Sequence, residues 1–379
     1  MAMSHRERVQ KALNHEETDR VPIDFSGGPA TQIHPTAYSN LLEYLGFPEE
    51  NLPVGHRGEG QVVAPSEKML QYFDIDVRGF YTSEPDSSIG KKLDGYRYTD
   101  EWGAVWDKSD VLHPYINVLG PLQHISEPVV ADVDSIPWPV PDDPGRIRGL
   151  RDKMLAVREQ SDYAIVLNLP NSTFALTQRV RGFVETLQDL LLYKAFAEAL
   201  QERITDVICG IAELSLNEVG DLIDGVSFAD DMGVQNQSYM SESLYKDMVK
   251  PHHRRFIDTL HKHTDAKVIT HSDGSIRELI PDFIDVGINC INPVQVSATG
   301  MEPEALNRDF GMDLAFWGGI DTQHVLPFGG PKEVIAAVHG RRKDLGKSGG
   351  YVQASVHNIQ PEVPPENIVA MFDTALGRN

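Results

Sequence analysis

The stretch 267–280, KVITHSDGSIRELI, carries the pattern that decides the fold. It begins with the apolar, β-branched residues of a buried strand and continues into the polar start of a helix. Ser275 and Glu278 match the S-x-x-E capping box at that start, and Gly287 is placed to end the helix. We therefore expect a strand followed directly by a helix, with His271 and Asp273 at the junction.

The same change from strand to helix recurs along the chain. Short apolar runs that are rich in β-branched or aromatic residues alternate with helical segments, and this alternation predicts parallel strands joined by crossover helices. Eight such units predict an α/β fold of the (β/α)8 TIM barrel type. A doubly wound open sheet is the alternative, but no G-x-G-x-x-G follows the first strand. The eight runs are residues 21–25, 76–80, 164–170, 224–231, 266–273, 288–294, 314–321 and 349–358.

The other segments are interpreted as additions to one barrel domain of residues 1–379. Ser4 and Glu7 form a capping box that begins an N-terminal helix, and residues 36–46 form a second helix that Gly46 ends. Between about residues 84 and 145, aromatic residues near a D-G turn predict a β-hairpin, and a proline-rich connection follows. We read this region as an insertion and not as a separate domain.

The composition excludes several classes of function. A formal net charge of −22 argues against nucleic acid and against anionic membrane surfaces, which both attract basic proteins. The sequence has no apolar run of transmembrane length, and its charged N-terminus lacks the apolar region of a secretion signal, so we expect a cytoplasmic protein. The two cysteines, Cys209 and Cys290, have no paired spacing and are predicted to be small core residues.

Polar side chains gather where the predicted strands end. Because the C-terminal ends of barrel strands meet on one face, these residues are expected to converge on an active site. Five successive strands show the pattern, with Asp230 and Asp231, His271 and Asp273, Asn292 and Gln295, Asp321 and Gln323, and His357 and Asn358. Asp24, after the first strand, is a weaker candidate.

His271, Asp273 and His357 form a candidate metal site. Two residues that are two apart in an extended segment point the same way, so His271 and Asp273 can reach one ion. Two imidazoles and a carboxylate suit catalytic zinc with an open position, and they also suit iron(II) in a facial triad. Asp230 and Asp231 face opposite ways, so only one can point into the barrel mouth, and the sequence does not decide which. Four further histidines, on a helix predicted over residues 241–263, are expected to be solvated: His252, His253, His261 and His263.

Long blocks of the chain resemble the uroporphyrinogen decarboxylase superfamily, which includes the corrinoid-dependent methyltransferases. They are RERVQKALNHEETDRVPIDF at residues 6–25, HSDGSIRELIPDFIDVGINCINPVQ at 271–295, FWGGIDTQHVLPFG at 316–329 and GGYVQASVHNIQPEVPPENI at 349–368. The resemblance implies a (β/α)8 barrel. The decarboxylases carry an arginine after the first strand that holds the porphyrin carboxylates, whereas residues 23–28 read IDFSGG. Porphyrinogen decarboxylation is therefore not expected, and the methyltransferase-like members are the better match.

The zinc methyltransferases of the family bind metal through an H-x-C pair and a later cysteine. His271 matches the histidine of that pair, Asp273 stands at the position of the first cysteine, and His357 opens the H-x-x-x-P segment that holds the second. The resemblance thus implies harder ligands in place of both thiolates.

The leading hypothesis is a methyltransferase that removes a methyl group from a small methoxylated or methylated substrate. A divalent metal, with zinc foremost, would assist, and a corrinoid on a partner protein or tetrahydrofolate would accept the methyl group. Asp230 or Asp231 and His357 are the expected catalytic residues, and Asn292, Gln295, Asp321 and Gln323 are expected to bind substrate. The alternatives are a metal-independent decarboxylase or lyase that acts on a small carboxylate, and a ligand-binding barrel without catalysis. A corrinoid protein and a second copy of the chain in a homodimer are the expected partners.

Overall fold

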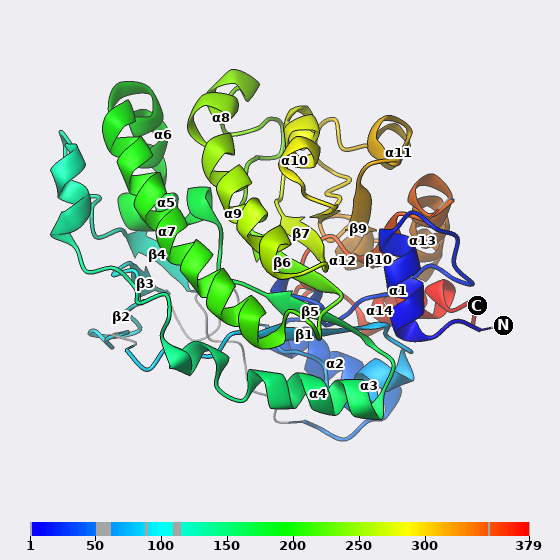
Figure 1. Ribbon diagram of the computed structural model, residues 1–379. Helices are drawn as coiled ribbons and strands as arrows, with labels where there is room; N and C mark the ends of the chain where they lie inside the picture. The colour runs from blue at the N-terminus through cyan, green and yellow to red at the C-terminus, as the bar shows by residue number, and fades with distance from the viewer. Residues whose placement is uncertain (1, 51–61, 88–89, 109–114, 348, 379) are drawn as a thin grey trace.

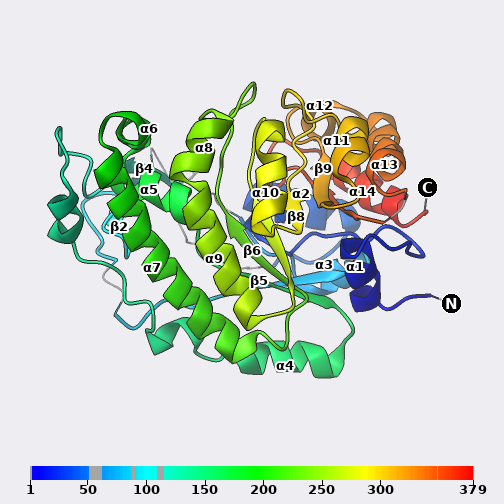
Figure 2. The same ribbon diagram turned by 45° about the horizontal axis from the view of Figure 1, so that its top comes forward.

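The computed structural model describes residues 2–50, 62–87, 90–108, 115–347 and 349–378, and it has a ring of parallel strands inside a layer of helices (Figures 1 and 2). Seven strands form one sheet in the order β1-β5-β6-β7-β8-β9-β10, and every neighbouring pair is parallel. The strands are β1 Val77–Tyr81, β5 Ala164–Asn168, β6 Gly225–Ala229, β7 Lys267–His271, β8 Cys290–Asn292, β9 Ala315–Ile320 and β10 Tyr351–Ser355.

The N-terminal run closes the ring between the two edge strands. On one side Gln353 of β10 donates its N–H to the Pro22 carbonyl at 2.9 Å and accepts the N–H of Asp24 at 2.9 Å. On the other side the Asp76 N–H, at the start of β1, donates to the Ile23 carbonyl at 3.0 Å. All eight predicted runs therefore take part, and the expected (β/α)8 architecture is confirmed.

Helices connect the strands and cover the outside of the ring. Long apolar faces hold α7 and α9 against the strands, and Figure 1 shows these two side by side outside β6 and β7. The helices are α1 His5–Leu13, α2 Pro35–Leu45, α3 Glu67–Tyr72, α4 Leu150–Gln160, α5 Thr173–Arg181, α6 Phe183–Leu192, α7 Lys194–Val219, α8 Glu242–Met248, α9 Lys250–His263, α10 Ile280–Val286, α11 Pro303–Phe310, α12 Val325–Phe328, α13 Pro331–Leu345 and α14 Pro365–Ala375. In the described part of the chain, none of them combines the length and apolarity of a membrane span.

The interior of the ring is filled mainly by valine and alanine side chains, and α1 covers one end of it. Val9 and Leu13 of α1 pack in the same cluster as Ile269, Cys290 and Trp317 of the strands. Cys290 is fully buried and Cys209 is buried under the helices, as predicted for core cysteines. The predicted N-terminal cap of α1 is present, because the Ser4 hydroxyl accepts the Glu7 N–H.

The region that the sequence marks as an insertion contains a small antiparallel sheet. Its strands are β2 Tyr98–Thr99, β3 Val105–Asp107 and β4 Ile116–Leu119. Antiparallel pairing of Lys92 with Tyr98 around the D-G turn at 94–95 confirms the predicted hairpin. Figure 1 shows this sheet next to α5 and α6, at one edge of the barrel.

Two expectations drawn from the helices are wrong. His252 and His253 are buried, because they lie four residues before Phe256 and Ile257, respectively, on the inner face of α9. The Ser275 hydroxyl does not cap a helix but donates to the Thr299 carbonyl, and α10 begins later, after the 3₁₀ turn Arg277–Leu279. Gly287 ends α10 in the left-handed conformation, as predicted.

Asp76 should be critical for closing the ring. Its carboxylate is fully buried, accepts the Ile23 N–H at 2.8 Å, and pairs with Arg8 and Arg20 at 2.6 Å each. Asp76→Asn removes the buried carboxylate that the two guanidinium groups share, and it leaves Arg8 with Asp19 alone and Arg20 with Asp74 alone, so we expect it to lower the free energy of unfolding by about 3–5 kcal/mol. Urea denaturation measures this change. Asp86→Asn, which breaks an exposed pair with Arg148, is the control and should leave the midpoint unchanged. Equal midpoints for Asp76→Asn and the wild type would contradict a critical role of Asp76 in closing the ring.

Candidate active site

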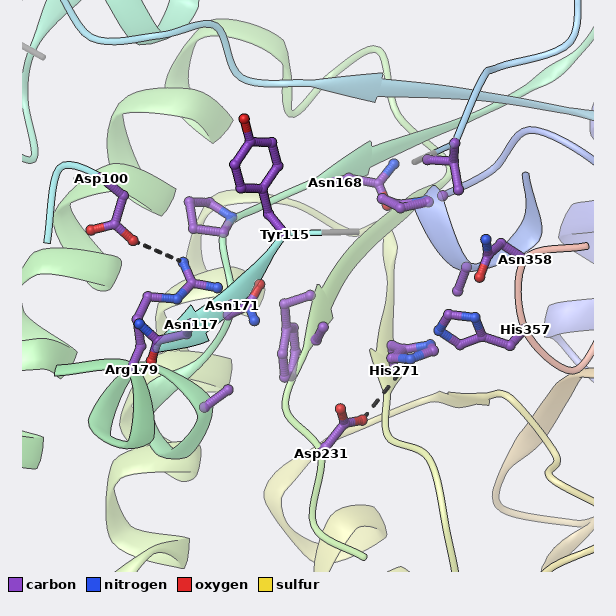
Figure 3. Close-up of a pocket in the computed structure, with 18 of the residues that line it drawn as sticks. Asp100, Tyr115, Asn117, Asn168, Asn171, Arg179, Asp231, His271, His357 and Asn358 are labelled. Carbon is purple, nitrogen blue, oxygen red and sulfur yellow. Dashed lines mark ion pairs between the residues drawn. The ribbon is translucent and has the colours of Figure 1, made fainter. Parts of the chain in front are cut away.

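A cavity of about 1910 Å³ opens at the C-terminal ends of the strands. It is larger than the roughly 300–1,000 Å³ of common ligand pockets. Residues that follow β5, β6 and β10 line it together with His271 at the end of β7, and so do residues of the β2-β3-β4 sheet and of α5. The cavity therefore extends from the barrel mouth to the inserted sheet, as Figure 3 shows.

Three residues that are distant in the sequence meet at the barrel mouth. His271 Nε2 lies 3.4 Å from Asp273 Oδ2, and His357 Nε2 lies 3.8 Å from the same oxygen. One ligand atom from each of the three lies within 4.8 Å of the others, and among the described residues they form the group that could hold a metal ion. Ligand atoms of a tetrahedral zinc site, with bonds of about 2.1 Å, lie roughly 3.4 Å apart. The two spacings from Asp273 Oδ2 to the histidine nitrogens are close to this value, and the limit of 4.8 Å for the whole set requires the side chains to move inward to bind one ion.

The orientation of the His271 ring is fixed by a second hydrogen bond. Its Nδ1 lies 2.8 Å from Asn292 Oδ1, so Nδ1–H donates to that amide and Nε2 faces Asp273. Parallel pairing of β7 with β8 places Asn292 directly beside His271. In a metal-binding histidine, the N–H of the ring nitrogen that does not bind the metal ordinarily donates to such an acceptor. Asn292 thus orients His271 and also lines the cavity.

The carboxylates around His271 alter its protonation. Burial by itself would lower the pKa of His271, but the charges of Asp273 and Asp231 and the bond to Asn292 raise that pKa to about 10. Burial would likewise raise the pKa of Asp273, and the His271 charge reverses the effect and lowers it. For Asp231, burial prevails and raises the pKa. The cluster therefore holds a proton on His271 and negative charge on Asp273 when no metal competes.

The structure decides which of the paired aspartates faces the cavity. Asp231 lines the cavity, accepts the Asp273 N–H at 2.9 Å, and lies 4.0 Å from His271 Nε2. Asp230 is buried, with its carboxylate 2.8 Å from His253 Nε2, and it accepts the N–H of Ala175 at 2.6 Å. Asp231 therefore faces the cavity. Asp230 holds the loop that carries both aspartates in place through its contacts with His253 and Ala175.

The other predicted substrate-binding residues contact loops and lie outside the lining of the cavity. Gln295 accepts the Gly274 N–H at 2.7 Å, Asp321 accepts the Gln323 N–H at 2.7 Å, and the Gln323 side chain accepts the Ser297 hydroxyl at 2.8 Å. Asp24 does reach the cavity, yet its carboxylate is buried and binds the Ser26 and Gly27 N–H groups. Asn358 is buried at the cavity wall.

Sequence reasoning missed the far end of the cavity. Arg179, from the last turn of α5, and Asp100, Trp106, Tyr115 and Asn117, from the inserted sheet, line that end. The strand pattern gave no signal for them, because the inserted sheet belongs to no barrel unit. A cluster of aromatic residues within the insertion was the one visible cue.

Comparison with known families agrees with this architecture. The family model described as uroporphyrinogen decarboxylase (URO-D) matches residues 121–377, which is more than half of the chain. The chain belongs to the uroporphyrinogen decarboxylase family. The predicted resemblance is thereby confirmed, and the family is one of enzymes. A comparison of this chain with curated protein sequences found no match.

One solved structure has a similar fold over nearly the whole chain. A methyltransferase from Methanosarcina mazei has a TM-score of 0.65 at 14% identity and covers 99% of each chain. A B12-independent methionine synthase from Shewanella sp. W3-18-1 has a TM-score of 0.45 at 12% identity, over 86% of this chain and 96% of that one. At 14% identity, the likeness to the Methanosarcina mazei structure shows the fold alone.

The protonation of His271 gives a prediction about pH. In chelator-treated protein, a pKa of about 10 keeps the ring charged across neutral pH. The folded state then binds the proton more tightly than the unfolded chain does, so this contribution to stability is complete below about pH 6.5 and is lost as the pH rises through 10. Nitrogen-15 NMR of the imidazoles, with His271→Gln to assign the signal, measures the titration.

Asp273→Asn is the matched test of the cause, because it removes the carboxylate that raises the pKa most while keeping the side-chain shape. We expect the His271 titration to move to lower pH in this variant. A wild-type ring that loses its proton near pH 6.5 would contradict the electrostatic description.

Proposed function

We propose that this protein is a metal-assisted methyltransferase that takes a methyl group from a methoxylated or methylated substrate and passes it to a corrinoid or to tetrahydrofolate. The observation that carries the proposal is the convergence of His271, Asp273 and His357 on one point, with His271 and His357 in the wall of the cavity. Membership of the family and the fold shared with the Methanosarcina mazei methyltransferase support it.

The donor set favours an oxygen-bearing substrate. His271, Asp273 and His357 would hold a divalent ion, with zinc foremost, through two nitrogens and one oxygen, and both cysteines are buried outside the cluster. A bound metal supplies Lewis acidity that polarises the oxygen of the substrate. Nitrogen and oxygen ligands make the site harder than one built of thiolates, which suits an ether oxygen better than a thiol.

The chain's own residues supply the proton and the orientation. When a methyl–oxygen bond breaks and the methyl group passes to the acceptor, the oxygen left behind must gain a proton. Asp231 can hold that proton on its carboxylate, since burial raises its pKa, and it faces the cavity 4.0 Å from His271 Nε2. Asn292 keeps the His271 ring in position, and Asn358 offers a buried amide at the same wall.

Metal content tests the proposed site. Protein purified without chelator should contain about one divalent ion per chain, and His271→Ala should lose it, because two donors seldom hold a catalytic ion. His339→Ala, on the exposed face of α13, is the control and should keep the metal. Elemental analysis by mass spectrometry gives the three values. Equal metal content in His271→Ala and in the wild type would remove the site.

Dependence on an acceptor tests the reaction. The purified protein alone should turn over little substrate, and a corrinoid protein or tetrahydrofolate should restore demethylation. Asp231→Asn should reduce the restored rate by about 10²–10⁴-fold, the usual contribution of a positioned acid, without loss of metal. Turnover that releases carbon dioxide without any acceptor would instead indicate the metal-independent decarboxylase, with Asp231 and His357 as acid and base.

A further inference from the structure

The rim of the barrel mouth has two chemically different halves. One half is ionisable, because Asp231 follows β6 and His271 ends β7. The other half is neutral, because β1 ends at Tyr81 and β5 ends at Asn168. All four residues line the cavity, and Figure 3 shows Asn168, His271 and His357 around the same open space. The candidate metal site occupies the ionisable half, and Tyr81 and Asn168 have no role in the function proposed above.

Hydrogen bonds between loops hold the neutral half together. Tyr81 and Asn168 are paired in the register of β1 with β5. Gln32 donates its side-chain Nε2–H to the Tyr81 hydroxyl at 2.9 Å. The Ile359 N–H, next to Asn358, donates to the Gln32 carbonyl at 2.9 Å and so fixes the loop after β10 against the same segment. These four cavity-lining residues form what we call the polar shelf: Gln32, Tyr81, Asn168 and Asn358.

The polar shelf presents one acceptor whose direction is fixed. Asn168 Nδ2 donates to the Gly27 carbonyl at 2.7 Å and to the Phe80 carbonyl at 3.2 Å, and both of these groups can only accept. The amide therefore has one orientation, and Asn168 Oδ1, to which no donor of the described residues bonds, is left for a ligand. Gly28 keeps this oxygen open, because a Cβ at that position would lie 2.9 Å from it.

The polar shelf also presents donors. The Tyr81 hydroxyl accepts the bond from Gln32, so its own hydrogen is available to a ligand. Burial and the charge of Asp24 raise the pKa of Tyr81, and the hydroxyl therefore keeps that hydrogen at neutral pH. Asn358 accepts the Gln360 side chain through its backbone carbonyl, whereas its own side-chain amide, buried at the cavity wall, makes no hydrogen bond within the described residues. These donors suit oxygen atoms and not a cation.

The charge of the cavity disfavours an anionic ligand. Carboxylates outnumber lysines and arginines among the described residues of the lining, and the polar shelf has no formal charge. The carboxylate of Asp24 is already occupied, because it accepts the Ser26 and Gly27 N–H groups and the Trp317 indole N–H. Hydroxyl groups both donate and accept, so they can pair with every open group of the shelf. An ether without hydroxyl groups would leave these buried groups unpaired, which is costly.

We propose that the polar shelf binds the hydroxyl groups of a neutral, polyhydroxylated substrate, such as a methylated sugar or a methylated cyclic polyol. One hydroxyl donates to Asn168 Oδ1, and others accept from Tyr81 and Asn358. The methoxy group of the substrate then lies toward His271 and His357. The placement of the methoxy group rests on the proposed function, whereas the binding of hydroxyl groups is a separate property of the cavity.

Isothermal titration of the full chain in the presence of EDTA tests the polar shelf. The hydroxylated probes are 3-O-methylglucose and pinitol, which is a methyl ether of inositol. The comparison ligand is 4-methoxytetrahydropyran, a cyclic methyl ether without hydroxyl groups. At least one hydroxylated probe should bind the wild type about tenfold or more tightly than the comparison ligand does, since each neutral hydrogen bond contributes about three- to tenfold in affinity.

Three variants identify the groups that bind. Tyr81→Phe and Asn358→Ala remove donors, and Gly28→Ala covers Asn168 Oδ1 with a methyl group. Each should weaken the binding of the hydroxylated probe by about three- to tenfold and leave the comparison ligand unaffected. Tyr44→Phe, on the exposed face of α2 and outside the cavity lining, is the matched control and should bind the probe as the wild type does. Near-ultraviolet circular dichroism checks that each variant is folded.

The proposal is overturned if neither hydroxylated probe binds the wild type more tightly than the comparison ligand. It is also overturned if the three folded variants bind the hydroxylated probe with wild-type affinity, or if they lose the probe and the comparison ligand equally. The titration requires neither a metal ion nor a methyl acceptor. A failure here therefore leaves methyl transfer from another class of substrate standing, and a failure of methyl transfer leaves this binding result standing.

Discussion

The register of the parallel strands is the constraint on which the candidate site depends. Ala229 pairs with His271, and His271 pairs with Asn292, so the ends of β6, β7 and β8 lie level at one rim. A shift of one residue in any of these pairings would turn the His271 ring to the opposite face of its strand. Closure of the ring by residues 22–24 brings β10, and with it the loop of His357, round to the same rim. Asp76 connects this closing segment to the start of β1.

At the rim, the binding of a proton and the binding of a metal ion would compete for His271. Asp273 and Asp231 hold a proton on His271, and a metal ion would have to displace that proton to bind the same nitrogen. The affinity for metal is therefore expected to rise with pH.

The barrel could be predicted from strand periodicity, and the hairpin of the insertion from its D-G turn. The gathering of His271, Asp273 and His357 follows from residues two apart in an extended segment and from strand ends that meet on one face. The sequence could not choose between Asp230 and Asp231, since the choice depends on the contact of Asp230 with His253 from α9. Burial of His253 itself was missed, because a helix with several polar residues reads as a surface helix until its partners are known. Gln295, Asp321 and Gln323 follow strands as expected, but local loop geometry directs them to backbone and side-chain partners outside the cavity. The Arg179 end required the inserted sheet to be placed against α5, which no local pattern encodes.

The central claim is that nitrogen and oxygen atoms of His271, Asp273 and His357 surround one ion. X-ray absorption spectroscopy of the metal in the purified protein tests it most directly, because it measures the identity and distance of the bound atoms. We predict a first shell of nitrogen and oxygen at about 2.0–2.1 Å, with the outer scattering of two imidazoles. A sulfur shell at about 2.3 Å, or a shell without imidazole, would contradict it.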